Sequence, residues 1–187
     1  KILASSGMEV IAYTKAIGGI VADTQDLQRD PDLKQKIRQS HLYCPDDLAT
    51  REMNKRLDAV RTEGDTLGGV VEILVRGCPA GLGEPVFDKM DADLAGALMG
   101  IGTVKAVEIG DGCEVALKKG SQMNDPIHPD GFGKNSAGGI LAGITTGQDI
   151  IVHVYCKPIP SVPRPQQTID LSGNSRTIQI QGRHDIC

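Results

Sequence analysis

Residues 64–110 restrict the possible folds more than any other part of the chain. A glycine-rich turn at 64–69 leads into the run 70–75, Val-Val-Glu-Ile-Leu-Val. This run is short and rich in β-branched residues, so it predicts a strand. The loop that follows, 77–85, has three glycines and two prolines, which exclude regular structure. The stretch therefore begins as a strand that ends in a rigid, irregular loop.

A helix and a second strand complete this stretch. From about Asp88 the apolar residues recur at the spacing of one helix face, and Gly100 is a typical C-terminal stop. Residues 104–109 predict the second strand. The order strand, loop, helix, strand predicts a βαβ-like unit that exposes much main chain. Its glycines would let a ligand approach the backbone, and an anion could bind at the helix start, but tight turns and packing alone would also explain them.

Composition and charge exclude several classes of protein. The chain has 187 residues, which suits one domain or a large part of one. Its net charge of −4 and pI near 5.5 argue against general nucleic-acid binding. No apolar run reaches the roughly 18 residues that a membrane span needs, so no membrane partner is expected. Aromatic residues make up only 3% of the chain and tryptophan is missing, so the core is expected to be aliphatic.

Cysteines and histidines give no sign of a metal site. The five cysteines are widely spaced and form no CxxC motif, which suits a reducing, cytoplasmic environment without structural zinc. The four histidines, at 41, 128, 153 and 184, form no paired motif. The chain starts at Lys1 without a methionine and stops directly after a polar run. We therefore expect residues 1–187 to be a single partial domain of a longer polypeptide.

The first sixty residues predict two strands and two helices. The strands are expected at 9–14 and 17–22, although Gly18-Gly19 weakens the second. A short helix is expected from Asp30, as N-cap, with Pro31 in its first turn. A longer helix should open at 45–47 and end at Gly64. Its inner face would carry Ala49, Met53, Leu57 and Val60. The charged outer face, with a Glu52–Arg56 pair, is more typical of a solvated surface than of a phosphate-binding stripe.

The second half of the chain alternates short elements with polar loops. A short helix is predicted at 111–119, with Asp111 and Glu114 as a capping-box-like pair. The polar stretch 120–133 is long for a simple connection, which suggests a functional or mobile loop. Residues 150–155 predict a strand. A hairpin is expected from 168–171 and 176–181.

Two segments near the C-terminus carry candidate functional residues. Lys157–Ser161 contains two prolines and predicts a stiff extended segment that could fix a lysine and nearby backbone groups in place. A purely structural crossover is the alternative. In Gly182–Asp185, Arg183 suits a phosphate or carboxylate through its fixed fork of donors, and Asp185 could act as a base. A surface ion pair is the alternative there.

In their order along the chain, several strings resemble the chorismate synthase family. They are GDTLGGVVEILVRGCPAGLGEPVFDKMDADLAGALMGI, VKAVEIGDG, GSQMND, NSAGGILAGITTGQDI, KPIPS and GRHD, and they cover most of the chain after about residue 60. The resemblance implies an α+β fold, a β-α-β sandwich with helices packed between antiparallel sheets, and a homotetramer. It also implies a carbon–oxygen lyase of aromatic amino-acid biosynthesis, in which 5-enolpyruvylshikimate-3-phosphate loses phosphate by 1,4-elimination to give chorismate. The implied cofactor is reduced FMN, with NADPH as a possible reductant.

The resemblance also implies a set of site residues. The family's flavin contacts fall on Gly102, Thr103, Ala142, Lys157, Pro158, Ile159, Pro160, Ser161 and Arg183. Arg183 also matches an arginine near the anionic groups of the substrate, and Asp185 matches an aspartate implicated in proton transfer. The chain departs from the family pattern where Ala142 replaces a usual glycine, Ile159 a common threonine and Ile186 a usual proline.

The family's N-terminal part should carry two key histidines, phosphate-binding arginines and a Ser-Ser-Ala flavin contact, and none of these is in the chain. We therefore expect the 187-residue piece alone to be inactive. A non-catalytic flavin-binding or scaffold fragment of the same fold is the main alternative. A sugar-phosphate or nucleotide enzyme that uses the glycine loops for anions is a weaker one, because no GxGxxG or GxxxxGK[ST] string is present.

Overall fold

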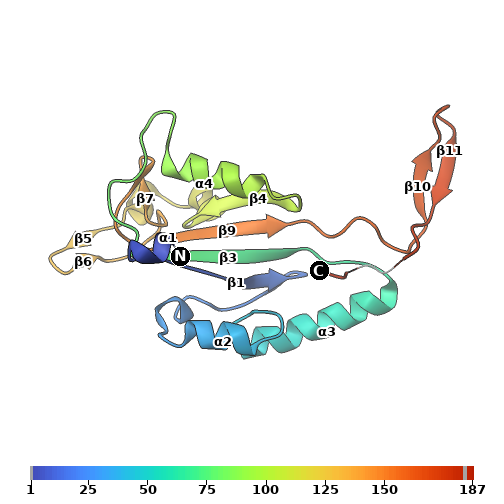
Figure 1. Cartoon of the computed structure of the whole chain (residues 1–187), viewed down its shortest axis with the longest axis horizontal. Coiled ribbons are helices and arrows are strands. Elements are labelled where there is room, and N and C mark those ends of the chain that lie inside the picture. The colour runs from blue at the N-terminus through green and yellow to red at the C-terminus, as the bar shows by residue number, and fades with distance from the viewer. Residues whose placement is uncertain (1, 183–184) are drawn as a thin grey trace.

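A computed structural model describes residues 2–182 and 185–187 and is built around one antiparallel sheet (Figure 1). Its five strands follow the order β2-β1-β3-β9-β4, and each is antiparallel to its neighbours. The strands are β1 (Glu9–Ile17), β2 (Ile20–Val21), β3 (Gly69–Arg76), β4 (Val104–Ile109) and β9 (Ile150–Cys156). The α+β class with an antiparallel sheet is confirmed, and within the described residues the chain supplies one large sheet of the sandwich.

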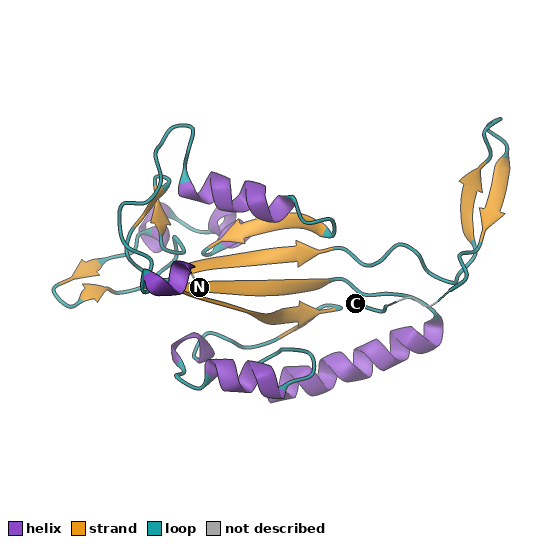
Figure 2. Cartoon of the chain, viewed as in Figure 1, coloured by secondary structure: helices purple, strands orange, loops and turns teal. Residues whose placement is uncertain are grey.

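Helices lie on both faces of this sheet (Figure 2). Helices α2 (Leu33–Gln39) and α3 (Asp47–Glu63) lie on one face, and α4 (Met90–Met99) lies on the other. A short helix, α1 (Ile2–Ser5), precedes β1. No helix among the described residues is long and apolar enough to cross a bilayer.

The predicted strand–loop–helix–strand unit is confirmed as β3, α4 and β4. Both strands pair antiparallel with β9, which lies between them, so β3 and β4 run in the same direction. Alternate residues of β9 face α4, because Ile150, Val152 and Val154 are buried in one cluster with the apolar side of that helix. The strand that separates the two halves of the unit thus comes from much later in the chain.

The opposite face of the sheet is covered by α2 and α3. Leu33 and Ile37 of α2 pack against Ile11, Tyr13 and Leu74 of the sheet. All four residues predicted for the inner face of α3 are buried, namely Ala49, Met53, Leu57 and Val60. The Asp46 carboxylate caps α3 by accepting hydrogen bonds from the backbone N–H groups of Leu48 (2.9 Å) and Ala49 (3.1 Å). Gly64 ends the helix in the left-handed conformation, at φ 67°.

Several local predictions are wrong for identifiable reasons. The strand predicted at 17–22 is only Ile20–Val21, because Gly18 and Gly19 adopt positive φ and form a hairpin turn after β1. Helix α2 begins at Leu33 rather than at Pro31, because the Asp30 side chain accepts from the backbone N–H of Asp32 and holds a turn there.

Two further corrections concern charged side chains. The helix predicted at 111–119 is a 3-10 helix, η2 (Gly112–Leu117), and Asp111 pairs with Lys118 at 2.6 Å instead of capping it. On α3, Glu52 pairs with Lys55 at 2.6 Å rather than with Arg56. In each case a lysine takes the place of the predicted partner, which was Glu114 for Asp111 and Arg56 for Glu52.

The remaining elements are short. One further 3-10 helix, η1 (Leu27–Arg29), precedes α2. The polar stretch 120–133 forms α5 (Gly120–Met123) and a small hairpin of β5 (Ile127–His128) and β6 (Gly131–Phe132). A tight hairpin of β7 (Ile140–Leu141) and β8 (Ile144–Thr145) precedes β9. The predicted C-terminal hairpin is present, but its strands β10 (Gln166–Ile169) and β11 (Ser175–Ile178) begin and end earlier than the predicted 168–171 and 176–181. The hairpin projects away from the sheet in Figure 1.

Candidate functional site

Two of the predicted site segments meet at one end of the sheet. Gly102 and Thr103 form the turn before β4, and Lys157 follows β9 directly. Because β4 and β9 are paired, this turn and the segment 157–161 lie side by side. The backbone N–H of Lys157 donates to the carbonyl oxygen of Thr103 at 2.9 Å. Residues more than fifty positions apart in the sequence are thereby joined through their main chains.

A mainly apolar pocket of about 360 Å³ opens at this junction. Three predicted flavin contacts line it: Thr103, Lys157 and Ile159. The remaining lining residues come from the ends of β1, β3 and β9, from the turn 64–69 and from the segment 185–187: Thr14, Ala16, Ile17, Leu67, Gly69, Val70, Val71, Cys156 and Cys187. The pocket combines one lysine with hydrocarbon walls, a combination typical of small-molecule sites. We call it the apolar pocket below.

The stiff segment 157–161 is held by main-chain contacts, as its prolines suggest. The buried Thr66 hydroxyl donates to the carbonyl oxygen of Ile159 at 2.7 Å. A Cβ on Gly68 would lie 2.7 Å from the carbonyl oxygen of Cys156 and 3.1 Å from Pro158 Cδ. Glycine is needed here because the turn 64–69 packs directly against the end of β9. At Gly68 the structure therefore supports close packing, and not the approach of a ligand to the backbone, as the reason for a glycine.

Ala142 is not brought to the apolar pocket within one chain. It lies in the β7–β8 turn with φ 52°, a conformation that favours glycine, and its side chain is exposed. The neighbouring Gly143 accepts a hydrogen bond from the backbone of Met90, so this turn lies at the start of α4. The turn precedes β9, whereas Lys157 follows it. Seven residues of strand, about 23 Å, separate the two positions.

Asp185 lies beside the same glycine-rich turn but in a separate, smaller pocket. This pocket has a volume of about 180 Å³ and is also lined by Thr66. Because the Thr66 hydroxyl donates to Ile159, Thr66 connects the Asp185 pocket with the segment 157–161. The carbonyl oxygen of Ile186 accepts from the backbone N–H of Leu67 at 2.8 Å. Arg183, the remaining predicted contact, lies outside the described residues.

A cavity larger than the apolar pocket was not anticipated from the sequence. It has about 780 Å³, lies on the α2 side of the sheet and is lined by polar groups such as Lys15, Lys118, Lys134 and His153. Glu72 lies at its base and is fully buried. The signal in the sequence was the single charged residue inside the apolar run 70–75.

Glu72 is surrounded by polar groups from the strands β1 and β9, the 3-10 helix η1 and the loop before η1. The Tyr13 hydroxyl and the Gln28 amide donate to its Oε1, and the Thr24 hydroxyl donates to Oε2 at 3.2 Å. His153 Nε2 lies 3.1 Å from Oε2 and Lys15 Nζ 3.6 Å. Burial by itself would raise the pKa of Glu72, but the hydrogen bonds and the lysine charge outweigh it and lower the pKa to about 2. Glu72 is therefore a buried anion at neutral pH.

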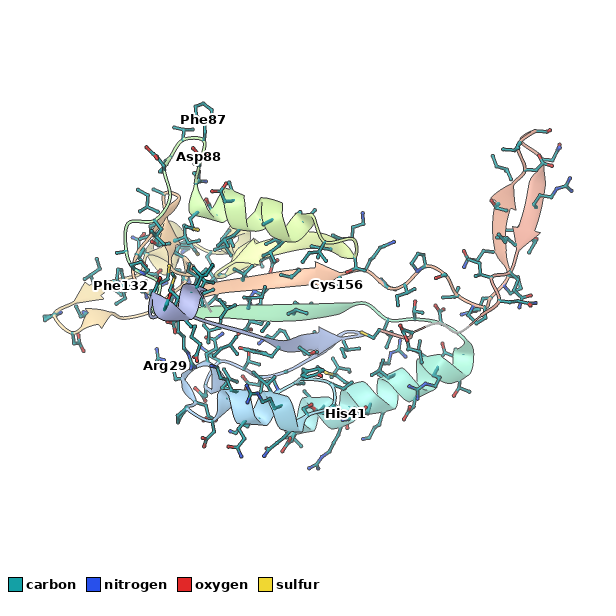
Figure 3. All side chains as sticks on the ribbon, in the orientation of Figure 1. Arg29, His41, Phe87, Asp88, Phe132 and Cys156 are labelled. Carbon is teal, nitrogen blue, oxygen red and sulfur yellow. The ribbon has the colours of Figure 1, made fainter. Side chains whose placement is uncertain are left out.

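The other described histidines do not gather at a site. His41 lies on the outer surface beside α3, where its Nε2 atom is hydrogen-bonded to Asn54 Oδ1 at 2.8 Å (Figure 3). His128 is exposed in the β5–β6 hairpin. Within residues 2–182 and 185–187, no three His, Cys, Asp or Glu side chains are arranged to hold a metal ion.

The sheet, its flanking helices and the apolar pocket together define an α+β domain with a candidate small-molecule site formed at the ends of its strands. The family profile described as chorismate synthase matches residues 1–187. The chain is 55% identical over 186 residues to a chorismate synthase of Syntrophus aciditrophicus, and 52% identical to that of Syntrophobacter fumaroxidans. Both alignments include 100% of this chain and 51% of the relative.

A solved structure gives the same result for the fold. The crystal structure of a chorismate synthase matches with a TM-score of 0.77 at 32% identity, covering 85% of this chain and 52% of that one. The chain belongs to the chorismate synthase family. It spans about half the length of the curated relatives it matches.

Proposed function

We propose that this chain is the part of a chorismate synthase that supplies one wall of its flavin site. The whole protein would convert 5-enolpyruvylshikimate-3-phosphate to chorismate by 1,4-elimination of phosphate and a ring hydrogen, and would thus be a lyase. Membership of the family supports this proposal. The observation that carries it is the meeting of Thr103 with Lys157 over the apolar pocket.

The lining of the apolar pocket fits a flavin ring better than a sugar phosphate. Its aliphatic side chains suit an aromatic ring system, and the backbone of segment 157–161 offers polar groups at one edge. In the proposal Thr103, Lys157 and Ile159 hold reduced FMN, with Gly102, Pro158, Pro160 and Ser161 beside them. When bound, this cofactor supplies a transient electron donor and proton acceptor.

The side chains of this chain would perform binding and proton transfer. The half-buried Lys157 ammonium lies at an apolar wall, where a positive charge attracts phosphate more strongly than it does in bulk water. Asp185 is exposed and has the chemistry to accept or hold a proton beside the site. Arg183, next to it in the sequence, would bind an anionic group of cofactor or substrate.

The position of Ala142 supports a site that is completed by another copy of the chain. Because β9 separates Ala142 from Lys157, both can contact one flavin only if they come from different protomers. The proposed homotetramer would provide this arrangement. Ala142 would then contribute main-chain groups, for which the side chain matters little.

A second candidate is that the 187-residue piece in isolation binds flavin without turnover. None of the described histidines, His41, His128 and His153, lines the apolar pocket. The acid–base groups that the family needs would then come from the half of the protein that this chain does not span.

An anaerobic assay with reduced FMN and 5-enolpyruvylshikimate-3-phosphate, in which chorismate is detected, tests the proposal. We expect turnover in a protein of the relatives' full length and none in the 187-residue piece. Lys157→Met and Asp185→Asn should each lower turnover at least tenfold, whereas Lys55→Met, on the exposed face of α3, should not. Replacing reduced FMN by FMN with NADPH tests the reductant. Absence of chorismate from the full-length protein, with flavin bound and substrate intact, would refute the proposed lyase activity.

A further inference from the structure

Two cysteine thiols share the apolar pocket. Cys156 is the last residue of β9 and is labelled at the end of that strand in Figure 3. Cys187 lies two residues after Asp185 in the sequence. Both line the same 360 Å³ space although they lie far apart in the sequence. Of the other cysteines, Cys44 and Cys78 are buried, and Cys113 is exposed beside Glu108.

Both cysteines lie beside Gly69 at the start of β3. In the antiparallel pairing of β3 with β9, Gly69 lies directly opposite Cys156. Side chains of directly opposed residues point to the same face, with Cβ atoms about 5 Å apart. The Sγ atom of Cys187 lies 3.8 Å from the position that a Gly69 Cβ would occupy. The Cys187 thiol is therefore in van der Waals range of that position, on the face of the sheet toward which the Cys156 side chain points.

The C-terminal segment is fixed in this position by two contacts. The backbone N–H of Leu67 donates to Ile186 at 2.8 Å, and the Ile186 side chain packs against the core cluster of α3. Burial, followed by the charge of Cys156, raises the pKa of the Cys187 thiol. The pair is thus held close together at the apolar pocket.

We propose that Cys156 and Cys187 form a reversible disulfide by exchange with small-molecule disulfides, and that this bond closes the apolar pocket. One thiolate attacks a sulfur of the small disulfide, which gives a mixed disulfide and releases one small thiolate. The second cysteine thiolate then displaces the other half of the small molecule. Two protein thiols are oxidised, one small disulfide is reduced to two thiols, and the two protons from the cysteines end on those thiols.

The bond would restrict the same space that Lys157 and Thr103 line. A disulfide holds its Cβ atoms about 3.8 Å apart, so bridging would pull the segment 185–187 across Gly69 and onto the end of β9. The oxidised protein would therefore have a smaller apolar pocket and a restrained Asp185. This redox control does not depend on which ligand the pocket binds.

The test is to incubate the folded, reduced protein with oxidised glutathione and to map its disulfides by mass spectrometry. We expect a Cys156–Cys187 cross-link that forms without denaturant and is fully reversed by dithiothreitol. Cys156→Ser and Cys187→Ser should each convert the remaining cysteine to a stable glutathione adduct. Cys113→Ser, a control outside the pocket, should leave cross-linking unchanged.

Two results would overturn the proposal. One is that Cys156 and Cys187 of the unsubstituted protein both accumulate separate glutathione adducts. The other is that both stay reduced while Cys113 reacts. Because the unsubstituted protein gives the deciding result, a folding defect in either serine variant would not obscure it.

Discussion

Acid should weaken this fold through one buried carboxylate, Glu72. Its pKa is lowered from the ordinary value of 4.5 to about 2, because the hydrogen bonds and charge around it outweigh the effect of burial. Between these two values the unfolded chain binds a proton that the folded chain does not. The free energy of unfolding therefore rises with pH across this window, and the contribution of Glu72 is fully present only above about pH 5.

The size of this contribution follows from the pKa difference. One pKa unit corresponds to about 1.4 kcal/mol, so the full effect of Glu72 on stability is about 3 kcal/mol. At about pH 3.5 the unfolded carboxyl is largely protonated and roughly 1.4 kcal/mol of this is lost. Replacing Glu72 by glutamine removes the charge that Lys15 compensates, and should cost about 3 kcal/mol at pH 7.

Urea unfolding at about pH 7 and pH 3.5 measures both effects. We expect the unsubstituted protein to lose about 1.4 kcal/mol more stability than Glu72→Gln over this pH change. Other titrating groups contribute equally to both proteins, so the difference between them isolates Glu72. Glu52→Gln is the matched control, because Glu52 lies on the exposed face of α3 and pairs only at the surface with Lys55.

Parallel loss of stability in the unsubstituted protein and in Glu72→Gln would refute this reasoning. It would mean that the Glu72 carboxyl titrates alike in the folded and unfolded states. The hydrogen bonds from Tyr13 and His153 would then not stabilise its charge. A loss in Glu52→Gln as large as that in Glu72→Gln would also contradict it, because burial would then have no effect.

Four further substitutions test the packing and the capping of the helices. Gly110→Ala should cost several kcal/mol in urea unfolding, because its Cβ would lie 2.3 Å from the carbonyl oxygen of Ser136. Gly96→Ala lies inside α4, where a Cβ meets no atom within 4 Å, and should stabilise the protein by about 0.5–1 kcal/mol. Equal effects of the two substitutions would contradict this reasoning. Asp46→Ala should cost about 1 kcal/mol by removing the cap of α3, and an unchanged midpoint would argue against the cap. Met53→Ala should cost about 2–5 kcal/mol, because Met53 is fully buried, and a cost below 1 kcal/mol would show that the core refills the space.

Where local interactions decide the structure, the sequence was sufficient. The start of α3 near 45–47, the stop at Gly64 and the inner face of the helix depend on residues close together in the sequence, and all three predictions are confirmed. The turn at Gly18-Gly19 was misjudged because the apolar residues on either side resemble one continuous strand. A hairpin and an interrupted strand differ only in the φ values of two glycines.

The Glu72 network could not be predicted, because its partners come from distant parts of the chain. Tyr13 lies 59 residues before Glu72 and His153 lies 81 residues after it. They become neighbours only because β3 lies between β1 and β9. In the same way, β9 lies beside β4, and this pairing brings Lys157 into contact with Thr103. The sequence predicted these strands but not the order in which they pair.

Glycine connects the fold to the candidate site. The turn 64–69 contacts the segment 157–161 through Gly68 and lies beside Cys187 at Gly69. The turn 64–69, the segment 157–161 and Cys187 are far apart in the sequence but meet in the fold. No side-chain motif in the sequence indicates that they do. A side chain at Gly68 or Gly69 would therefore disturb the fold and the apolar pocket together, because each Cβ would meet a backbone carbonyl oxygen within 3 Å. A change at Lys157 alters only a half-buried side chain at the end of a strand, so it can separate binding from folding.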